Sequence, residues 1–162
     1  MLGTVTQLNR LISNEISSTD LEANRIIIGG FSQGGAMSLL TGLTNERQLG
    51  GVAVMSGWLP LKHKFQTVRL MKFPFNPCPL FIFYFCKMAT PHAKNIPLFW
   101  GHGKDDPLVL YKFGTDSRDF LINNVGVKQS SFEFRSYDGM QHTSCKEELD
   151  DLLAWIKKVI PQ

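Results

Sequence analysis

Short apolar runs recur along the chain and predict four β-strands. Three of them are nearly continuous hydrophobic stretches, at residues 25–31, 51–56 and 96–101. Runs of this kind are typical of strands that are buried on both faces of a parallel sheet. A fourth segment, residues 132–137, alternates between apolar and polar side chains, which is the period of a β-strand.

Segments with a helical period separate these runs. We predict helices at residues 4–18, 33–43, 110–123 and 144–160. The apolar positions of the first helix are Val5, Leu8, Leu11, Ile12 and Ile16, and those of the last are Leu149, Leu152, Leu153, Ile156 and Ile160. Strands that alternate with helices in this way predict an α/β fold with a mostly parallel sheet flanked by helices, in a single domain over residues 1–162.

The last helix carries a start signal in its sequence. Ser144 and Glu147 have the S-x-x-E spacing of a capping box, and Lys157 and Lys158 suit the negative end of the helix dipole. We therefore expect this helix to begin at Ser144.

A G-x-S-x-G motif stands at the junction of the first strand and the second helix. Ser32 lies between Gly30 and Gly34, where a side chain at either glycine would collide with neighbouring backbone in a tight strand-to-helix turn. The N–H of Gln33 would then point at a developing oxyanion, beside the positive end of the helix dipole. The motif predicts a nucleophilic serine. The alternative is a glycine-rich turn of a nucleotide-binding unit, although neither G-x-G-x-x-G nor a P-loop lysine is present.

Two further strand ends offer partners for this serine. Asp106 follows the third strand and His142 follows the fourth, and the carboxyl ends of parallel strands meet at one edge of the sheet. The chain order Ser, Asp, His is the order of α/β-hydrolases. We expect His142 to act as the general base and Asp106 to orient it. Asp105 is the rival acid and is expected to be a solvated turn residue, while His102 is expected to cap backbone groups in its loop.

Composition narrows the class of protein further. The chain is 43% hydrophobic and its net charge is only +3, so a packed core is expected and nucleic acid is not an expected partner. No basic, hydrophobic leader opens the chain, and no apolar stretch approaches the ~20 residues of a membrane span. The three cysteines have no metal-site spacing. We expect a cytoplasmic protein, with the nucleus as an additional compartment.

Five blocks of sequence, taken in order, resemble the acyl-protein thioesterases of the phospholipase/carboxylesterase family. They are residues 28–36, 56–61, 101–103, 106–109 and 137–142. The resemblance implies an α/β-hydrolase that removes long acyl chains, typically palmitoyl, from cysteine thioesters of membrane-associated proteins. It also implies carboxylesterase or lysophospholipase side activity, acyl lipids as further substrates, transient contact with membrane surfaces, and no cofactor or metal.

The same resemblance marks residues that bind substrate. Trp58, Leu59, Pro60 and Leu108 match positions that line the acyl groove of the family. The alternative for Trp58 and Leu59 is an ordinary core position after the second strand. Met140 beside His142 suits an apolar acyl pocket, with an ordinary core position as its alternative.

The chain departs from the family pattern in two places. The family has several strands before the nucleophile strand, and a His-Gly loop there donates the second oxyanion N–H. We therefore expect a partial α/β-hydrolase fold that lacks those strands, with an unpaired edge at the first strand and impaired turnover. Residues 66–86, rich in Phe and Pro, have no family counterpart and are predicted to be an insertion that derives from a retained intron. A hydrophobic membrane-touching flap and a poorly packed loop are the alternatives.

Overall fold

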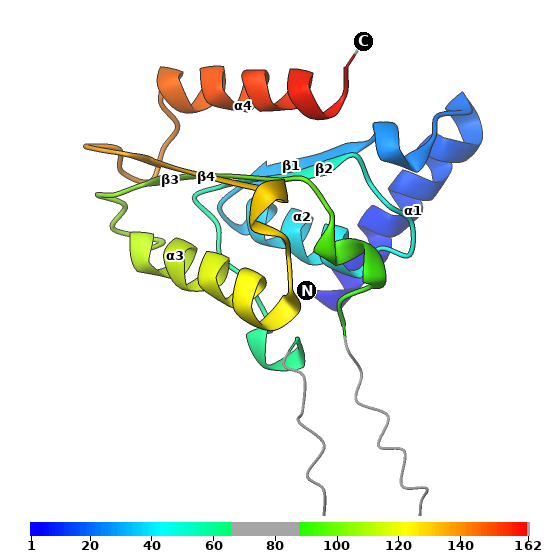
Figure 1. Cartoon of the computed structure of the whole chain (residues 1–162), viewed down its shortest axis with the longest axis horizontal. Coiled ribbons are helices and arrows are strands. Elements are labelled where there is room, and N and C mark those ends of the chain that lie inside the picture. The colour runs from blue at the N-terminus through cyan, green and yellow to red at the C-terminus, as the bar shows by residue number, and fades with distance from the viewer. Residues whose placement is uncertain (66–87, 162) are drawn as a thin grey trace, which may run out of the picture.

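A four-stranded parallel sheet forms the middle of three layers in the computed structural model, which describes residues 1–65 and 88–161 (Figure 1). The strands lie side by side in chain order, β1-β2-β3-β4. Their bounds are β1 (Ile27–Phe31), β2 (Gly51–Met55), β3 (Leu98–Gly103) and β4 (Phe132–Tyr137). Each neighbouring pair is parallel, as the sequence predicted, so all four carboxyl ends lie at one edge of the sheet.

Helices cover both faces of the sheet. They are α1 (Leu2–Thr19), α2 (Gln33–Thr44), α3 (Tyr111–Phe120) and α4 (Lys146–Val159). α2 packs on β1 and β2 and α3 on β3, while α4 packs on β3 from the opposite face and α1 packs on α2 (Figure 1). The predicted α/β architecture is therefore correct.

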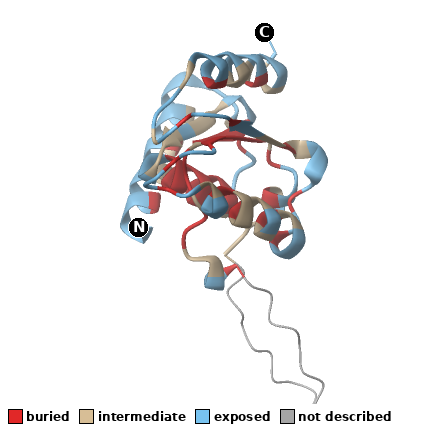
Figure 2. Cartoon of the chain, turned by 90° about the vertical axis from the view of Figure 1, so that its left-hand side faces the viewer, coloured by how far each residue is buried: buried red, intermediate tan, exposed pale blue. Residues whose placement is uncertain are grey.

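The buried core lies mainly between the sheet and the α2–α3 layer (Figure 2). Val52, Val54, Leu98 and Trp100 point into this core from the two central strands. A smaller cluster of Ala53, Phe99 and Trp155 lies between the sheet and α4. Residues 52 and 53, or 99 and 100, point to opposite faces because side chains alternate along a strand.

β1 differs from its prediction. The continuous apolar run was expected to be buried on both faces, but β1 is an edge strand whose residues are half-buried and whose Gly29 is exposed. Among the described residues it pairs only with β2. The unpaired edge that was expected for this strand is therefore present in the structure.

The C-terminal ends of β3 and of the third helix differ from their predictions by two residues or more. β3 runs on to His102 and Gly103, which were expected in a loop, because both pair with Ser136 and Tyr137 of β4. The helix predicted to Asn123 ends as α3 at Phe120 and continues as a single π-helical turn, Leu121–Val125.

The apolar stripe of α1 is narrower than the sequence suggested. Val5 and Ile12 are buried and Leu8 and Ile16 pack against the core, whereas Leu11 is 57% exposed. α2 packs against one side of this helix.

The capping box predicted for the last helix is wrong. α4 is capped by Cys145, whose Sγ accepts a hydrogen bond from the N–H of Glu148 at 3.4 Å. The start signal is thus displaced by one residue from Ser144 and Glu147. This shift places Glu148 against β3.

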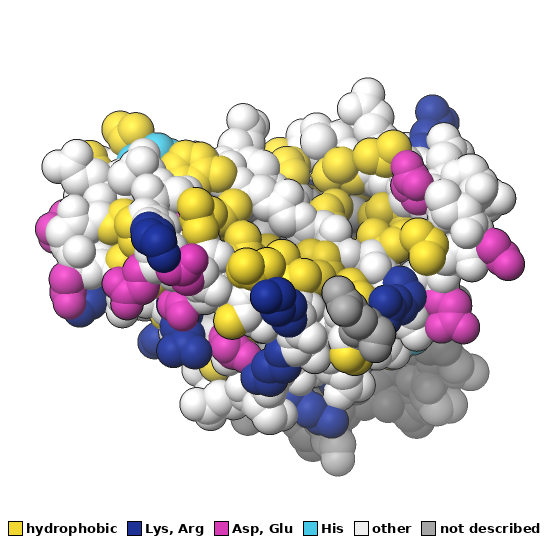
Figure 3. All heavy atoms as spheres, turned by 90° about the horizontal axis from the view of Figure 1, so that it is seen from above, with side chains coloured by type: hydrophobic (Ala, Val, Ile, Leu, Met, Phe, Trp, Pro, Cys, Tyr) yellow, Lys and Arg dark blue, Asp and Glu magenta, His cyan; other side chains and the backbone are white. Residues whose placement is uncertain are grey.

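The predicted apolar face of α4 is also only partly correct. Leu152 and Ile156 pack on the core, but Leu149 and Leu153 are half-exposed. The most buried apolar residue of α4 is Trp155, whose ring lies 5.9 Å from that of Phe99. From the α4 side, hydrophobic side chains form a band across this face of the molecule (Figure 3).

The predicted insertion at residues 66–86 lies outside the described residues. In the part of the chain that the structure describes, no helix is both long and apolar enough to cross a membrane.

Candidate active site

Ser32 lies on a strained turn between β1 and α2. Its backbone has φ 54° and ψ −120°, a conformation that non-glycine residues rarely adopt. The N–H of Ser32 donates to the carbonyl of Met55 at 2.8 Å, which holds the turn against the end of β2. A Cβ on Gly30 would lie 2.5 Å from the carbonyl carbon of Gly34. Glycine at position 30 is therefore required for the turn, as predicted.

The second glycine of the motif has a different role from the one predicted. A Cβ on Gly34 would meet no described atom within 4 Å, so the predicted collision there is wrong. The tight position is Gly35, where a Cβ would lie 2.7 Å from the carbonyl oxygen of Gly30. One residue of helix rotation turns Gly34 to the surface and Gly35 onto the strand.

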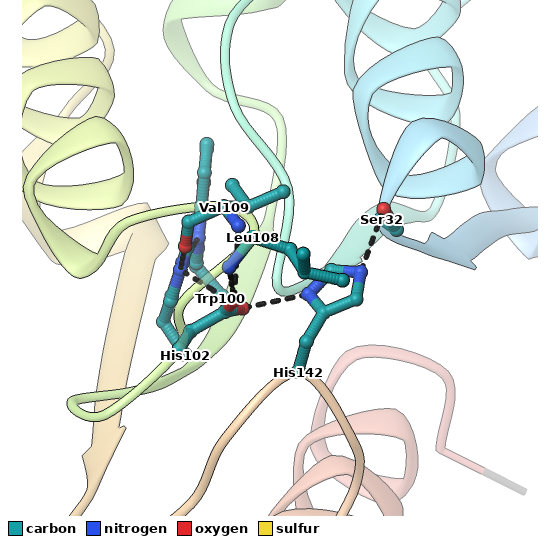
Figure 4. Close-up of polar contacts among 7 residues, drawn as sticks. Ser32, Trp100, His102, Leu108, Val109 and His142 are labelled. Carbon is teal, nitrogen blue, oxygen red and sulfur yellow. Dashed lines mark hydrogen bonds and ion pairs between the residues drawn. The ribbon is translucent and has the colours of Figure 1, made fainter.

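Ser32, His142 and Asp106 form a continuous chain of hydrogen bonds (Figure 4). The hydroxyl of Ser32 lies 3.0 Å from Nε2 of His142, and Nδ1 of His142 lies 2.7 Å from Oδ2 of Asp106. The three residues come from loops that follow β1, β3 and β4, which end at the same edge of the sheet. Parallel pairing thus brings together side chains that are up to 110 positions apart.

His142 is partly open to solvent and packs on an aromatic ring. Its side chain is 15% exposed, and its ring centroid lies 4.7 Å from that of Phe31. The loop that carries it is tied to the Asp106 loop, because the N–H of Asp105 donates to the carbonyl of Met140 at 3.2 Å. The imidazole is therefore held between the end of β1 and the loop after β3.

Asp106 is buried and has hydrogen bonds on both oxygens. Oδ1 accepts the N–H groups of Leu108 and Val109, each at 2.9 Å, and Oδ2 accepts from His142. Burial acts to raise the pKa of Asp106, but the hydrogen bonds from His142, Val109 and Leu108 outweigh it, so the pKa is lowered. The carboxylate is therefore ionised and oriented toward the imidazole.

The rival residues occupy other environments. Asp105 is exposed, as expected of a solvated turn residue. His102 is fully buried, and its Nε2 lies 2.8 Å from the carbonyl oxygen of Val109. It therefore contacts a backbone group, as predicted, but from within β3 and not from a loop.

Gln33 is the first residue of α2. The first helical hydrogen bond runs from the N–H of Ala36 to the carbonyl of Ser32, so the N–H of Gln33 has no partner within the helix. This free N–H lies immediately after Ser32, where the helix dipole favours negative charge.

A groove of about 420 Å³ adjoins the loop that holds Asp106. This volume lies in the range of small-molecule sites. Leu108 is 72% exposed at the groove, which leaves its side chain available to an apolar ligand. The lining residues are Trp58, Leu59, Lys62, Leu108, Val109, Phe113, Asp116 and Ser117.

Three of the five predicted substrate-binding residues, Trp58, Leu59 and Leu108, lie on this groove. Pro60 and Met140 are buried and are not among its lining residues. The backbone carbonyl of Met140 accepts the N–H of Asp105, and its side chain is buried. Its role in substrate binding stays a prediction.

Sequence reasoning missed residues that act by contact across the fold. The ring of Phe31 packs at a tilt against that of His142. The Ser117 hydroxyl accepts the N–H of Leu59 at 2.9 Å, which fixes the groove wall to α3. Phe31 is the variable position between Gly30 and Ser32, and Ser117 reads as an ordinary helix residue. Neither residue belongs to a sequence pattern that would have pointed to the site. Within residues 1–65 and 88–161, no group of three or more His, Cys, Asp or Glu is placed to hold a metal ion.

The sequence matches the phospholipase/carboxylesterase family over residues 2–76 and 81–160. The match includes residues 66–76 and 81–86 of the segment for which no family counterpart was expected, and leaves out only residues 77–80 of it. The chain belongs to this family of α/β-hydrolases. It is 40% identical to an acyl-protein thioesterase 1 of Cryptococcus neoformans, over 99% of this chain and 62% of the relative. It is 39% identical to an acyl-protein thioesterase 1 of Mycosarcoma maydis, with the same coverage.

Solved structures agree with this placement. Arabidopsis thaliana SOBER1 superposes with a TM-score of 0.79 at 30% identity, over 98% of this chain and 64% of that chain. Zea mays acyl-protein thioesterase 2 superposes with a TM-score of 0.72 at 26% identity, over 98% and 65%. The chain therefore spans somewhat less than two thirds of the length of these relatives.

Proposed function

We propose that this chain is a serine hydrolase with Ser32 as nucleophile, His142 as general base and Asp106 as the residue that orients the base. The observation that carries the proposal is the hydrogen-bonded series at 3.0 Å and 2.7 Å from Ser32 Oγ through His142 to Asp106. A nucleophile, a base within hydrogen-bond reach and a third group that orients the base form the arrangement that activates a serine hydroxyl.

The reaction follows from these roles. His142 Nε2 takes the proton of Ser32 as Oγ attacks the carbonyl carbon of the substrate, and the N–H of Gln33 donates to the oxyanion. The bond to the leaving sulfur or oxygen then breaks, and His142 returns the proton to that atom. A water molecule next attacks the acyl-serine, again through His142, and releases the fatty acid and the free hydroxyl of Ser32.

The proposed substrates are long-chain acyl thioesters and carboxylic esters, and the proposed partners are S-acylated proteins and acyl lipids at membrane surfaces. Relatives at 39–40% identity are named acyl-protein thioesterases, which supports the thioester. The groove beside Asp106, with apolar walls from Trp58, Leu108 and Phe113, supports an apolar acyl group. The proposed compartments are the cytoplasm and the nucleus.

We expect turnover by this chain to be low. Among the described residues, the N–H of Gln33 is the oxyanion donor that we assign. The second donor of the family comes from the His-Gly loop, and loss of one oxyanion donor lowers the rate of an enzyme roughly 10²–10³-fold. A folded site with a slow reaction is therefore the expected state of the chain by itself.

Covalent labelling with a fluorophosphonate tests the proposal even where turnover is slow. We expect the wild-type chain to become labelled at Ser32 and the Ser32→Ala variant to remain unlabelled, with an unchanged circular dichroism spectrum. A palmitoyl thioester and a short-chain ester, assayed in parallel, report the preferred substrate. A folded wild-type chain that resists the probe but binds acyl groups would instead be a non-catalytic binding protein.

A further inference from the structure

His102 is wholly buried, yet both of its ring nitrogens have polar partners. Nε2 lies 2.8 Å from the carbonyl oxygen of Val109, and the indole Nε1 of Trp100 lies 3.4 Å from Nδ1 (Figure 4). Carbonyl oxygens only accept and indole N–H groups only donate. One arrangement satisfies both contacts, namely the neutral imidazole with its proton on Nε2 and a lone pair on Nδ1.

The ring of His102 is also fixed in position by α3. A Cβ on Gly114 would lie 2.6 Å from Nδ1, so the helix backbone packs directly on the imidazole. The ring of Tyr111 approaches edge-on at 5.9 Å. His102 therefore has one orientation, set by β3 and α3.

Val109 connects this fixed ring to the acid of the site. Its carbonyl accepts from His102, and its N–H donates to Oδ1 of Asp106 at 2.9 Å. Nε2 of His102 also lies 3.8 Å from Oδ2 of Asp106, too far for a hydrogen bond but near enough for the N–H dipole to favour the carboxylate. That Oδ2 is the oxygen that meets His142.

We infer that His102 is a positioning residue, whose neutral imidazole holds Val109 so that the carboxylate of Asp106 faces His142. The inference rests on the proposed function for its effect on turnover, but the orientation of Asp106 can be measured without turnover. His102 is not itself a lining residue of the groove, and it acts on Asp106 through Val109.

The charge state of His102 agrees with this role. Burial lowers the pKa of His102, and the contacts with Val109 and Asp106 oppose that shift only in part, while His142 adds to it. Asp106, His142 and Tyr111 are the titratable groups that face the ring. A second proton would place an N–H on Nδ1 against the N–H of Trp100, so the neutral ring is the form that fits.

Two amide substitutions test the inference as a matched pair. The amide nitrogen of His102→Gln reaches the position of Nε2 and can donate to Val109, whereas the shorter side chain of His102→Asn cannot. We expect His102→Asn to lower kcat for an ester about 10²-fold with KM little changed, because a misplaced catalytic group costs a factor of that size. We expect His102→Gln to recover most of this loss. Phe99→Leu, on the other face of β3 and equally buried, is the control for lost core packing and should leave kcat unchanged.

Imidazole NMR separates this inference from the proposed function. ¹⁵N shifts should place the proton of His102 on Nε2, and the Nδ1–H signal of His142 should be protected in the wild type and His102→Gln but exchange rapidly in His102→Asn. A proton on Nδ1 of His102, or an equally protected His142 signal in His102→Asn, overturns the inference whether or not the chain is active. Loss of protection without any labelling of Ser32 would support the positioning role and refute the hydrolase. The wild-type tautomer remains decisive if His102→Asn does not fold.

Discussion

At the scale of single residues, the adjacent carboxylates of Asp105 and Asp106 differ in burial and in hydrogen bonding. Asp106 is buried with hydrogen bonds on both oxygens, whereas Asp105 is exposed. Only Asp106 is held against Nδ1 of His142, at 2.7 Å. Orientation, and not charge alone, therefore distinguishes the two.

Asp106→Asn should reduce hydrolysis and fluorophosphonate labelling strongly, by up to ~10⁴-fold, because an amide stabilises the wrong tautomer of His142. Asp105→Asn is the matched control and should change either rate less than threefold. Rates measured by single-turnover labelling avoid any limit set by product release. The reverse ranking would show that Asp105 is the acid.

Glu148 is a buried acid that the proposed reaction does not use. Its side chain is fully buried against Gly101, and neither carboxyl oxygen has a hydrogen-bond partner among the described residues. Burial raises the pKa of Glu148 from 4.5 to about 7. The folded protein therefore favours the protonated acid.

The free energy of unfolding should fall as the pH rises above the ordinary pKa of a glutamate, 4.5, and through about 7. Between pH 4.5 and 7 the folded state retains a proton that the unfolded chain releases, so Glu148 lowers the free energy of unfolding by roughly 2–3 kcal/mol between pH 5 and pH 8. Glu148→Gln should remove that part of the pH dependence, as measured by urea unfolding at both pH values. Glu147→Gln, at an exposed neighbour, should leave it unchanged. If the free energy of unfolding changed equally with pH in the wild type and in Glu148→Gln, Glu148 would not be the source of the pH dependence.

At the scale of elements, the junction of β1 and α2 requires glycine at positions 30 and 35 but has room for a side chain at position 34. Gly30 and Gly35 pack backbone on backbone, while Gly34 faces a surface hollow of about 440 Å³. The hollow is also lined by Gln33. The close approach that holds Ser32 in its strained conformation depends on Gly30 and Gly35.

Gly34→Ala should be neutral or stabilising by up to ~1 kcal/mol, because alanine is the better helix former. Gly35→Ala should destabilise the protein and slow labelling of Ser32, since its Cβ would push α2 away from the end of β1. Thermal unfolding and labelling rate measure both effects. Equal outcomes for the two variants would mean that the turn is not closely packed.

At the scale of the whole molecule, one side of the sheet lacks a partner among the described residues. The backbone groups of Ile26 and Ser32 bond to β2, so those of the alternate residues Ile27, Gly29 and Phe31 face outward. The molecule also has an apolar surface. Leu149 and Leu153 of α4 are exposed, and hydrophobic side chains form a band across the α4 face (Figure 3). Open strand edges and apolar surfaces promote association.

The chain by itself should therefore associate with itself as its concentration rises, in sedimentation velocity. Ile27→Pro removes an outward N–H, and the extended backbone of Ile26 (φ −104°, ψ 122°) accepts a following proline, so this variant should associate less. Ile28→Pro would remove an inward N–H and should destabilise the fold instead. A monomer at all concentrations in the wild type would refute the edge as an association site.

Local patterns in the sequence determined the order and type of the elements and the convergence of three strand ends. The apolar runs and helical periods depend on neighbouring residues along the chain, and parallel strands necessarily end at one edge. Ser32, Asp106 and His142 could be selected on that basis, while their catalytic roles and that of Gln33 remain predictions.

Only the tertiary structure decided which faces are covered and which polar groups meet. Cys145 replaced the predicted cap because α4 is positioned by the packing of Trp155 on the sheet, and Leu11 and Leu149 are exposed because no described element covers them. The partnership of His102 with Val109 joins a strand to a loop. Contacts of this kind depend on distances in space, and residue spacing along the chain contains no record of them.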